Sequence, residues 1–428
     1  MLTVFYLLFV ALNVWFAYNL YKPNFKNTKL MVPSFLAGWL IGELAFFAIA
    51  VQILFTLIFV QFDAVSGFVG YLALLVNIGA WFFYAQYYLA ANETPFVFED
   101  ALCSAFGIDY QKQIYPEVQR KIPESVEIER LLKPFALDLP DVERIKNIRY
   151  DHQDGINLRL DIYRKKGESH SAENKKPVLL QIHGGAWTYR LGSKDEQGRP
   201  LMNHLASNGW ICVSINYRLS PKATFPEHII DCKKALVWIK EHIAEYGGDP
   251  NFIVATGGSA GGHLCSLLAL SANDPHFQPG FEKADTTVQA CVPFYGIYDF
   301  SNSNRLHANR GLISHVSKSV LKKPFKGNEE LYYQASPIHR IHANAPPFLV
   351  IQGDCDTLVS APEAALFAAK LADVSRESVC YVELEGAQHA FDIFVSLRSE
   401  HCKHGVHRYL SYLHSQYLQG KTNTKTKS

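Results

Sequence analysis

The sequence has little of what would indicate a metal centre, a disulfide scaffold or a nucleic-acid partner. Its eight cysteines are scattered, without a Cys-x-x-Cys pair or a Cys/His cluster at metal-ligand spacing. The 41 Lys and Arg residues nearly balance 40 Asp and Glu, so the formal net charge is +1 and no field would collect nucleic acid. We therefore expect buried free thiols, a reducing compartment for the polar part of the chain, and no nucleic-acid partner.

Long apolar runs are confined to the first 91 residues. Residues 2–21, 35–60 and 65–90 are each long enough to cross a hydrocarbon core of about 30 Å. No Lys or Arg precedes the first run and no A-x-A-like site follows it, which favours an uncleaved helix over a signal peptide. We predict a transmembrane region of three helices at residues 1–91.

The charged residues between these runs predict the orientation. Lys22, Lys26 and Lys29 lie between the first two runs, whereas the second connection holds only Asp63. The positive-inside rule then places the first connection and everything after residue 91 in the cytoplasm, with the anchor in the inner (cytoplasmic) membrane. Glu43 lies within the second run; since no other ionisable residue accompanies it there, we expect a protonated or hydrogen-bonded side chain between helices rather than a transport or relay site.

The remaining chain divides into a connector, one large domain and a tail. Residues 92–146 are polar and contain five prolines, which indicates a connector with short helices that could supply part of a lid. Residues 147–418 alternate short apolar runs with helical stretches, which predicts a mostly parallel, doubly wound α/β sheet. Residues 419–428 are expected to be a disordered tail. In such a sheet, ligands bind beyond the carboxyl ends of the strands, so motifs directly after a strand carry the chemistry.

The first such motif is GGSAG at residues 257–261, between a predicted strand and a helical stretch. Small residues on both sides of Ser259 allow the sharp turn that exposes a nucleophilic hydroxyl. The second motif, HGGAW at residues 183–187, follows an upstream strand and supplies a glycine-rich turn. We expect His183 only to orient this turn. Backbone N–H groups from both motifs are predicted to form an oxyanion hole, from Gly184, Gly185 or Ala186 together with Ala260.

Two further motifs follow late strands. The segment 352–359 offers two carboxylates, and we predict that Asp356 partners a histidine because it forms an Asp-x-x-Val pattern, whereas Asp354 belongs to the turn. His389 follows the last predicted strand, so the three residues occur in the order Ser, Asp, His. We predict that His389 takes the proton of Ser259 and that Asp356 fixes the histidine tautomer. Because the protein supplies every group, no metal or organic cofactor is expected.

With these motifs and the stretch NYRLSPKATFPEHIIDCKKALVWIKEHIAEYGGDP at 216–250, residues 147–415 resemble the hormone-sensitive-lipase-like esterases. The resemblance implies the α/β-hydrolase fold and a carboxylesterase that works through an acyl-enzyme, with a helical lid from the connector and residues 301–345. The chain departs from that family at Ala186, where a third glycine is usual, and at Gly258, where an acidic residue is usual. Both departures are similar to feruloyl-esterase-like and arylformamidase-like relatives.

The leading hypothesis is therefore a membrane-anchored serine hydrolase, esterase or lipase-like, whose ester substrate partitions into or comes from the lipid bilayer. Amide hydrolysis by an arylformamidase-like enzyme is the alternative, because the same triad cleaves both bonds. A catalytically silent binding module is less favoured, since such relatives look to have lost a triad residue. A transporter would need polar groups across the membrane, and only Glu43 offers one.

Overall fold

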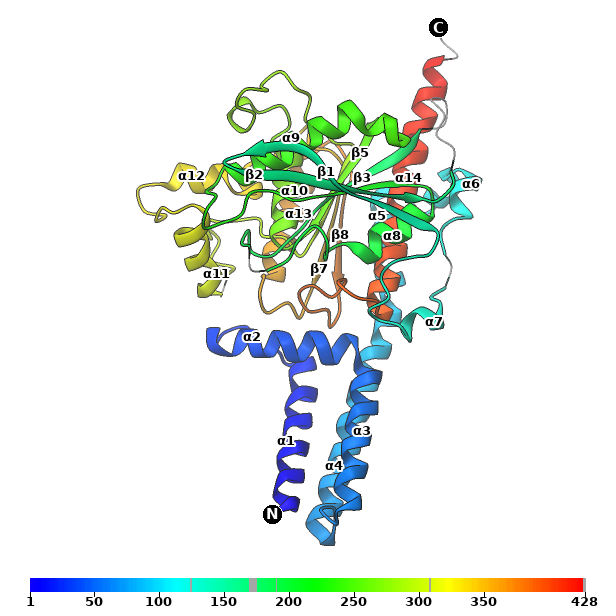
Figure 1. Cartoon of the computed structure of the whole chain (residues 1–428), viewed down its shortest axis with the longest axis vertical. Helices are drawn as coiled ribbons and strands as arrows, with labels where there is room; N and C mark the ends of the chain where they lie inside the picture. Colours follow the sequence, from blue (N-terminus) through cyan, green and yellow to red (C-terminus); the bar gives the residue numbers. More distant parts are fainter. Residues whose placement is uncertain (124, 169–174, 190, 308, 426–428) are drawn as a thin grey trace.

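The first 90 residues form a stalk of helices, and an α/β domain sits at one end of this stalk (Figure 1). The computed structural model describes residues 1–123, 125–168, 175–189, 191–307 and 309–425. Helices α1, α3 and α4 run side by side, and the N-terminus lies at the end of the stalk away from the domain. The stalk elements are α1 (Leu2–Tyr21), α2 (Thr28–Leu36), a π-helical turn (Ala37–Ile41), α3 (Ala45–Gln61) and α4 (Gly67–Ala90).

Polar side chains inside the stalk bond to one another, while large apolar side chains face outward. Asn13 Nδ2 donates to Asn77 Oδ1 (2.8 Å), and Asn77 Nδ2 donates to Thr56 Oγ1 (3.1 Å). An apolar exterior with satisfied interior polar groups is what a bilayer requires of a helix bundle. Two helices, Leu2–Tyr21 and the stretch that begins at Gly67, are long and apolar enough to cross a membrane, or three if the bent pair described next is one span.

The stretch 35–60, predicted as one membrane helix, is broken. Its two halves, Lys29–Ile41 and Ala45–Gln61, are bent by 92°, and α2 lies across the stalk directly against the α/β domain (Figure 1). The break contains Glu43, which is 3% exposed and accepts a hydrogen bond from Ser396 Oγ (2.7 Å). A carboxylate in hydrocarbon is costly, and here the bend carries Glu43 out of the bundle to polar partners in the domain. Glu43 is thus bonded to the domain and not between membrane helices.

The connector packs along one face of the domain. It contains α5 (Thr94–Phe106), α6 (Pro116–Gln119) and α7 (Ile128–Leu131). Helix α5 packs against the last strand and the C-terminal helix. At the other end of the connector, the Pro134 carbonyl accepts a hydrogen bond from Val395 N (2.9 Å), so the connector also reaches the loop after the last strand.

Eight strands form one sheet in the order β1-β2-β4-β3-β5-β6-β7-β8. The pairs β1/β2 and β2/β4 are antiparallel and all others are parallel, as the sequence predicts. The predicted domain starts at residue 147, but the sheet begins earlier, because β1 starts at Val142 within the predicted connector. The strands are β1 (Val142–Gln153), β2 (Ile156–Lys165), β3 (Lys176–Ile182), β4 (Ile211–Ile215), β5 (Gly248–Gly258), β6 (Ala290–Phe294), β7 (Phe348–Gly353) and β8 (Val379–Leu384).

Helices cover both faces of the sheet and enclose two apolar cores. One core packs α9 (Glu227–His242), α10 (Ala260–Leu270) and α13 (Ala361–Val374) against the sheet, and the other packs α5, α8 (Arg199–Ser207) and α14 (Leu397–Lys425). Short helices α11 (Arg310–His315) and α12 (Glu329–Gln334) follow β6. The carboxyl ends of the parallel strands point toward α2 and the stalk (Figure 1).

Two smaller expectations can be compared with the structure. All eight cysteines are unpaired, and six of them are buried while Cys103 and Cys355 are partly exposed. The tail predicted to be disordered from residue 419 instead continues α14 as far as Lys425, and residues 426–428 lie outside the described residues. A helix nucleated by packing propagates at little further cost, which a composition argument does not capture.

Candidate active site

Ser259 occupies a strained turn between β5 and α10. Its backbone has φ +58° and ψ −120°, a region that non-glycine residues rarely adopt. The turn is tight because a Cβ at Gly257 would lie 2.5 Å from the Ile182 carbonyl oxygen, and one at Gly261 only 2.0 Å from that oxygen. Glycine is therefore required on both sides of the serine, as the sequence motif predicts.

Tyr295 explains why position 258 holds glycine. A Cβ at Gly258 would lie 2.7 Å from the Tyr295 hydroxyl oxygen, so a larger residue has no room. The Tyr295 ring also lies 4.6 Å from the His389 ring, between centroids, and its hydroxyl donates to Asp392. Tyr295 thus contacts both the turn that carries Ser259 and the predicted base.

His389 and Asp356 are directly bonded. The distance from His389 Nδ1 to Asp356 Oδ2 is 2.7 Å, and the carboxylate is buried. Such a bond leaves Nε2 of the histidine as the nitrogen able to accept a proton. Three further donors fix the orientation of the Asp356 carboxylate, namely Leu358 N (2.9 Å), Val359 N (2.8 Å) and Gln352 Nε2 (3.1 Å).

Asp354 has a different role from its neighbour. Its Oδ1 accepts a hydrogen bond from the backbone N–H of Gly386 (2.7 Å), which joins the turn after β7 to the turn after β8. Burial raises the pKa of this carboxyl above its ordinary value. The carboxylate that faces His389 is therefore that of Asp356, and Asp354 lies in the turn.

The structure brings Ser259 to the same strand ends without a direct contact to the base. Among the described residues, no hydrogen bond joins the Ser259 hydroxyl to His389. Tyr295 approaches both Gly258, next to Ser259, and the His389 ring. The nucleophile turn and the base are therefore both next to the Tyr295 side chain. Hydrogen bonds of this kind are often long in unliganded hydrolases and shorten when substrate binds.

The predicted oxyanion loop lies against the nucleophile turn, with one change in its donors. A Cβ at Gly184 would lie 3.1 Å from the Ser259 Cβ, which shows how closely the loop approaches. The N–H of Gly184 donates to Gln197 Oε1 (2.5 Å), so this group is already bonded and the prediction of Gly184 as a donor is corrected. In the part of the chain that the structure describes, no acceptor takes the N–H of Gly185, Ala186 or Ala260.

The loop has left-handed backbone conformations that explain its glycine content. Gly185 has φ +105°, and Ala186 and Trp187 have φ +51° and +59°. The Ala186 carbonyl accepts a hydrogen bond from His315 Nε2 (2.8 Å) in α11, which lies in the predicted lid segment 301–345. That segment therefore packs on the oxyanion side of the site.

His183 lies behind the loop and not in the reacting constellation. Its Nδ1–H donates to the Gly184 carbonyl (2.7 Å), and its ring stacks on Tyr217 at 4.5 Å between centroids. Burial lowers the pKa of His183 to about 4, so the imidazole is neutral at pH 7. These contacts agree with a residue that orients the turn.

The stalk covers the histidine side of the site. Phe35 of α2 stacks on Trp39 (5.3 Å between centroids, 11° between planes) and meets the His389 ring edge-on at 6.3 Å. The Thr357 hydroxyl donates to the Met31 carbonyl (3.1 Å). Phe35 and Trp39, which were predicted to lie in a membrane helix, thus form a wall of the candidate site.

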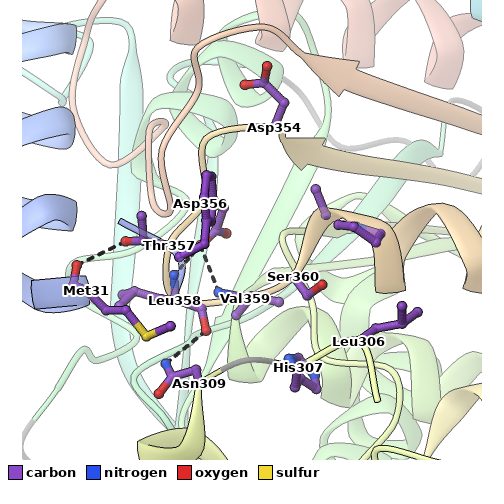
Figure 2. Close-up of a pocket in the computed structure, with 13 residues that line it drawn as sticks. Met31, Leu306, His307, Asn309, Asp354, Asp356, Thr357, Leu358, Val359 and Ser360 are labelled. Carbon is purple, nitrogen blue, oxygen red and sulfur yellow. Dashed lines mark hydrogen bonds between the residues drawn. The ribbon is translucent and has the colours of Figure 1, made fainter. Parts of the chain in front are cut away.

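A cavity of about 340 Å³ lies beside the Asp356 loop. Figure 2 shows Met31 of α2, the loop from Asp356 to Ser360, and the segment with Leu306 and His307 around it. Two of the dashed lines mark the bond from Thr357 to Met31 and the bond from Asn309 to the Leu358 carbonyl. Neither Ser259 nor His389 lines this cavity. The cavity therefore borders the loop that holds the Asp356 carboxylate and not the nucleophile or the base.

Several residues that shape the site were missed by the sequence analysis. Tyr295 directly follows β6, so its position beyond a strand end was an available signal. Gln197 lies 13 positions from its partner Gly184, and Trp39 lies 351 positions from Ala390, to which its indole N–H donates. Neither residue belongs to a local motif, and only the fold brings them to the site.

Known proteins with similar sequences and structures are esterases. The family described as BD-FAE matches residues 160–371. The chain is 47% identical over 301 residues to the probable carboxylic ester hydrolase LipM of Mycobacterium tuberculosis, a match that covers 70% of this chain and 67% of that protein. It is 39% identical over 337 residues to esterase LipQ of the same organism, covering 77% of each. Among solved structures, a truncated carbohydrate esterase from gut microbiota has a TM-score of 0.52 at 21% identity, covering 64% of this chain and 99% of that one, which shows the shared fold.

Proposed function

Because the chain belongs to the α/β-hydrolase carboxylic ester hydrolases, we propose that it cleaves esters with Ser259 as nucleophile, His389 as general base and Asp356 as the partner of His389. The observation that carries this proposal is the 2.7 Å bond between His389 and Asp356 at the strand ends where Ser259 sits in its strained turn. Three of the predicted oxyanion donors complete the proposed site, the N–H groups of Gly185, Ala186 and Ala260.

The proposed reaction has two steps. His389 Nε2 takes the proton of Ser259 as its oxygen attacks the ester carbonyl, and the tetrahedral oxyanion accepts hydrogen bonds from the loop and from Ala260. His389 then gives the proton to the leaving alcohol, and an acyl-enzyme remains. Water attacks this second ester by the same route, releasing the acid and restoring Ser259. Asp356 stabilises the imidazolium in both steps.

We further propose that α1, α3 and α4 cross a membrane, with the catalytic domain on the cytoplasmic side. The outward apolar side chains of the stalk support a lipid environment. Lys22 and Lys26, in the segment that joins α1 to α2, and Lys29, in the first turn of α2, are exposed. This segment lies on the domain side of the stalk (Figure 1), where the positive-inside rule predicts the cytoplasm. An ester that partitions into the bilayer is the proposed substrate class.

The test uses the full chain purified in detergent and p-nitrophenyl butyrate as substrate. Ser259→Ala is expected to lower kcat by a factor of about 10⁴ or more, because the step needs the hydroxyl itself. The matched control is Ser266→Ala, which removes a buried hydroxyl of helix α10 that donates to the Gly262 carbonyl (2.7 Å) within the helix. The control should keep its turnover within a few-fold. Equal turnover in the wild type and Ser259→Ala would exclude this nucleophile.

A further inference from the structure

The loop that carries His389 is held by residues of the stalk. It runs from Glu385, after β8, to Arg398, at the start of α14. Hydrogen bonds from the stalk reach its beginning, middle and end. They join the Tyr87 hydroxyl to the Gly386 carbonyl, the Trp39 indole N–H to the Ala390 carbonyl (2.9 Å), and the Ser396 hydroxyl to the Glu43 carboxylate (2.7 Å).

Glu43 and Arg398 form the centre of this attachment. Both side chains are almost fully buried, at 3% and 2% exposed, and the guanidinium donates directly to the carboxylate. Arg398 also donates from Nη2 to the Glu385 carbonyl (3.1 Å) and lies over the Tyr87 ring at 5.3 Å from its centroid. One buried ion pair therefore connects both ends of the histidine loop to the bend of the stalk.

The two parts also approach too closely for larger residues. A Cβ at Gly38 would lie 2.9 Å from the Gln388 side chain, directly before His389, and one at Gly386 of the histidine loop would lie 3.0 Å from the Tyr87 ring of α4. Gln388 Oε1 in turn accepts the N–H of Thr357 (3.2 Å), next to Asp356. The stalk thus contacts the two loops that supply the proposed base and its carboxylate.

We propose that the stalk completes the active site, and that Glu43 is a positioning residue that holds the His389 loop through Arg398. This inference rests on the proposed role of His389 as general base. Its physical reason is that the base must stay within hydrogen-bond reach of Ser259, and a displacement of about 1 Å in such a group lowers a rate by about 100-fold. Loss of the Glu43 carboxylate leaves Arg398 buried without its charge partner, so the loop shifts.

The experiment measures turnover per active site in the full chain. Fluorophosphonate titration counts functional sites, and p-nitrophenyl butyrate hydrolysis then gives kcat and KM for each site. We expect Glu43→Gln and Arg398→Met each to lower kcat by about 10- to 100-fold with little change in KM, since a small ester does not contact the loop anchor. The double variant should be no slower than the slower single one, because both changes remove the same link.

Asn77→Leu is the matched control. Asn77 is a fully buried polar residue of the same bundle and is bonded to Asn13 and Thr56; among the described residues, it makes no hydrogen bond to a catalytic loop. This variant tests whether a weakened stalk alone slows the enzyme, and its turnover per titrated site should equal that of the wild type. Trp39→Phe keeps the stack on Phe35 but loses the bond to Ala390. It tests a second attachment of the His389 loop, and we expect a smaller loss of kcat than in Glu43→Gln.

The outcomes separate the two proposals. A wild type that fails to react with the fluorophosphonate contradicts the proposed function itself. A wild type that titrates normally, with unchanged kcat per site in Glu43→Gln and Trp39→Phe, overturns the positioning role alone. Equal losses in Asn77→Leu and Glu43→Gln also overturn it, since the effect would then come from general weakening of the stalk.

Discussion

Trp39 and Ala390 are joined by a hydrogen bond of 2.9 Å from the indole N–H to the backbone carbonyl, across 351 positions of the chain. Ala390 directly follows His389, and Trp39 stacks on Phe35, which meets the histidine ring. Phe35 and Trp39, which lie between α1 and α3 in the chain, therefore form the wall of the site next to the base.

The two aspartates of the β7 loop should differ sharply in their effect on catalysis. Asp356→Asn is expected to lower kcat by about 10⁴-fold, because the amide favours the wrong histidine tautomer. Asp354→Asn should change kcat by less than about threefold, since an amide oxygen can still accept the Gly386 N–H. Steady-state kinetics with p-nitrophenyl butyrate compares them, and a larger loss in Asp354→Asn would reverse the assignment.

Gln197 is expected to hold the oxyanion loop in place. Gln197→Leu removes the acceptor of the Gly184 N–H, so this buried donor loses its partner and the loop should shift. We expect kcat to fall by about 10- to 100-fold, less than the roughly 10²- to 10³-fold loss for removal of an oxyanion donor, because the donors stay in place but are displaced. The control is Glu196→Gln, an exposed neighbour. Equal kcat in both variants would mean that the loop does not need this bond.

Position 186 should tolerate glycine and reject a β-branched residue. Ala186 has φ +51°, which is unfavourable by roughly 1–2 kcal/mol for a residue with a side chain and not for glycine. Ala186→Gly should therefore keep kcat within about twofold and raise the unfolding temperature, whereas Ala186→Val should lower both. Thermal scans and kinetics on the same preparations provide the measurement. A destabilised glycine variant would show that packing of the methyl group dominates.

Buried neutral histidines predict that the folded state weakens in acid. Burial lowers the pKa of His183 and of His263 to about 4 and that of His228 to about 3, below the ordinary value of 6.5. Between pH 6.5 and about 4, the unfolded chain binds more protons than the folded chain. The free energy of unfolding is therefore highest above pH 6.5 and decreases as the pH falls. Each group then loses up to about 1.4 kcal/mol per pH unit.

Unfolding temperatures measured from pH 7.5 to pH 4.5 test this expectation. They should be level above about pH 6.5 and decrease below it. His263→Gln, which can keep a donor toward the Ala335 carbonyl, should have a shallower slope than the wild type. An unfolding temperature that rises toward acid would contradict the assignment of neutral imidazoles.

The sheet and the strand-end motifs could be predicted because their signals are local. A fully apolar run such as β3 indicates a buried strand, and glycines around Ser259 indicate the turn that follows β5. Asp356 and His389 were predicted from their places after late strands, and the structure joins them by a hydrogen bond. Chain order and strand ends were sufficient for these residues.

The role of the stalk could not be predicted from hydropathy. Residues 35–41 are as apolar as a membrane helix, but hydropathy does not record that Trp39 finds a carbonyl in the domain. Glu43 was treated as an isolated carboxylate because its partner, Arg398, lies 355 positions away. The helix bends where Glu43 pairs with Arg398 of the domain, and sequence periodicity carries no information on such a tertiary ion pair.

The most direct test of the central claim is to map the covalent adduct by mass spectrometry. The full chain is treated with a fluorophosphonate, digested, and compared with His389→Ala treated for the same time. The account predicts one adduct per chain on the peptide that contains Ser259, and labelling slowed by about 10³-fold or more in the histidine variant, because the unassisted hydroxyl is a weak nucleophile. An adduct on another residue, or equal labelling rates in the two proteins, would contradict it.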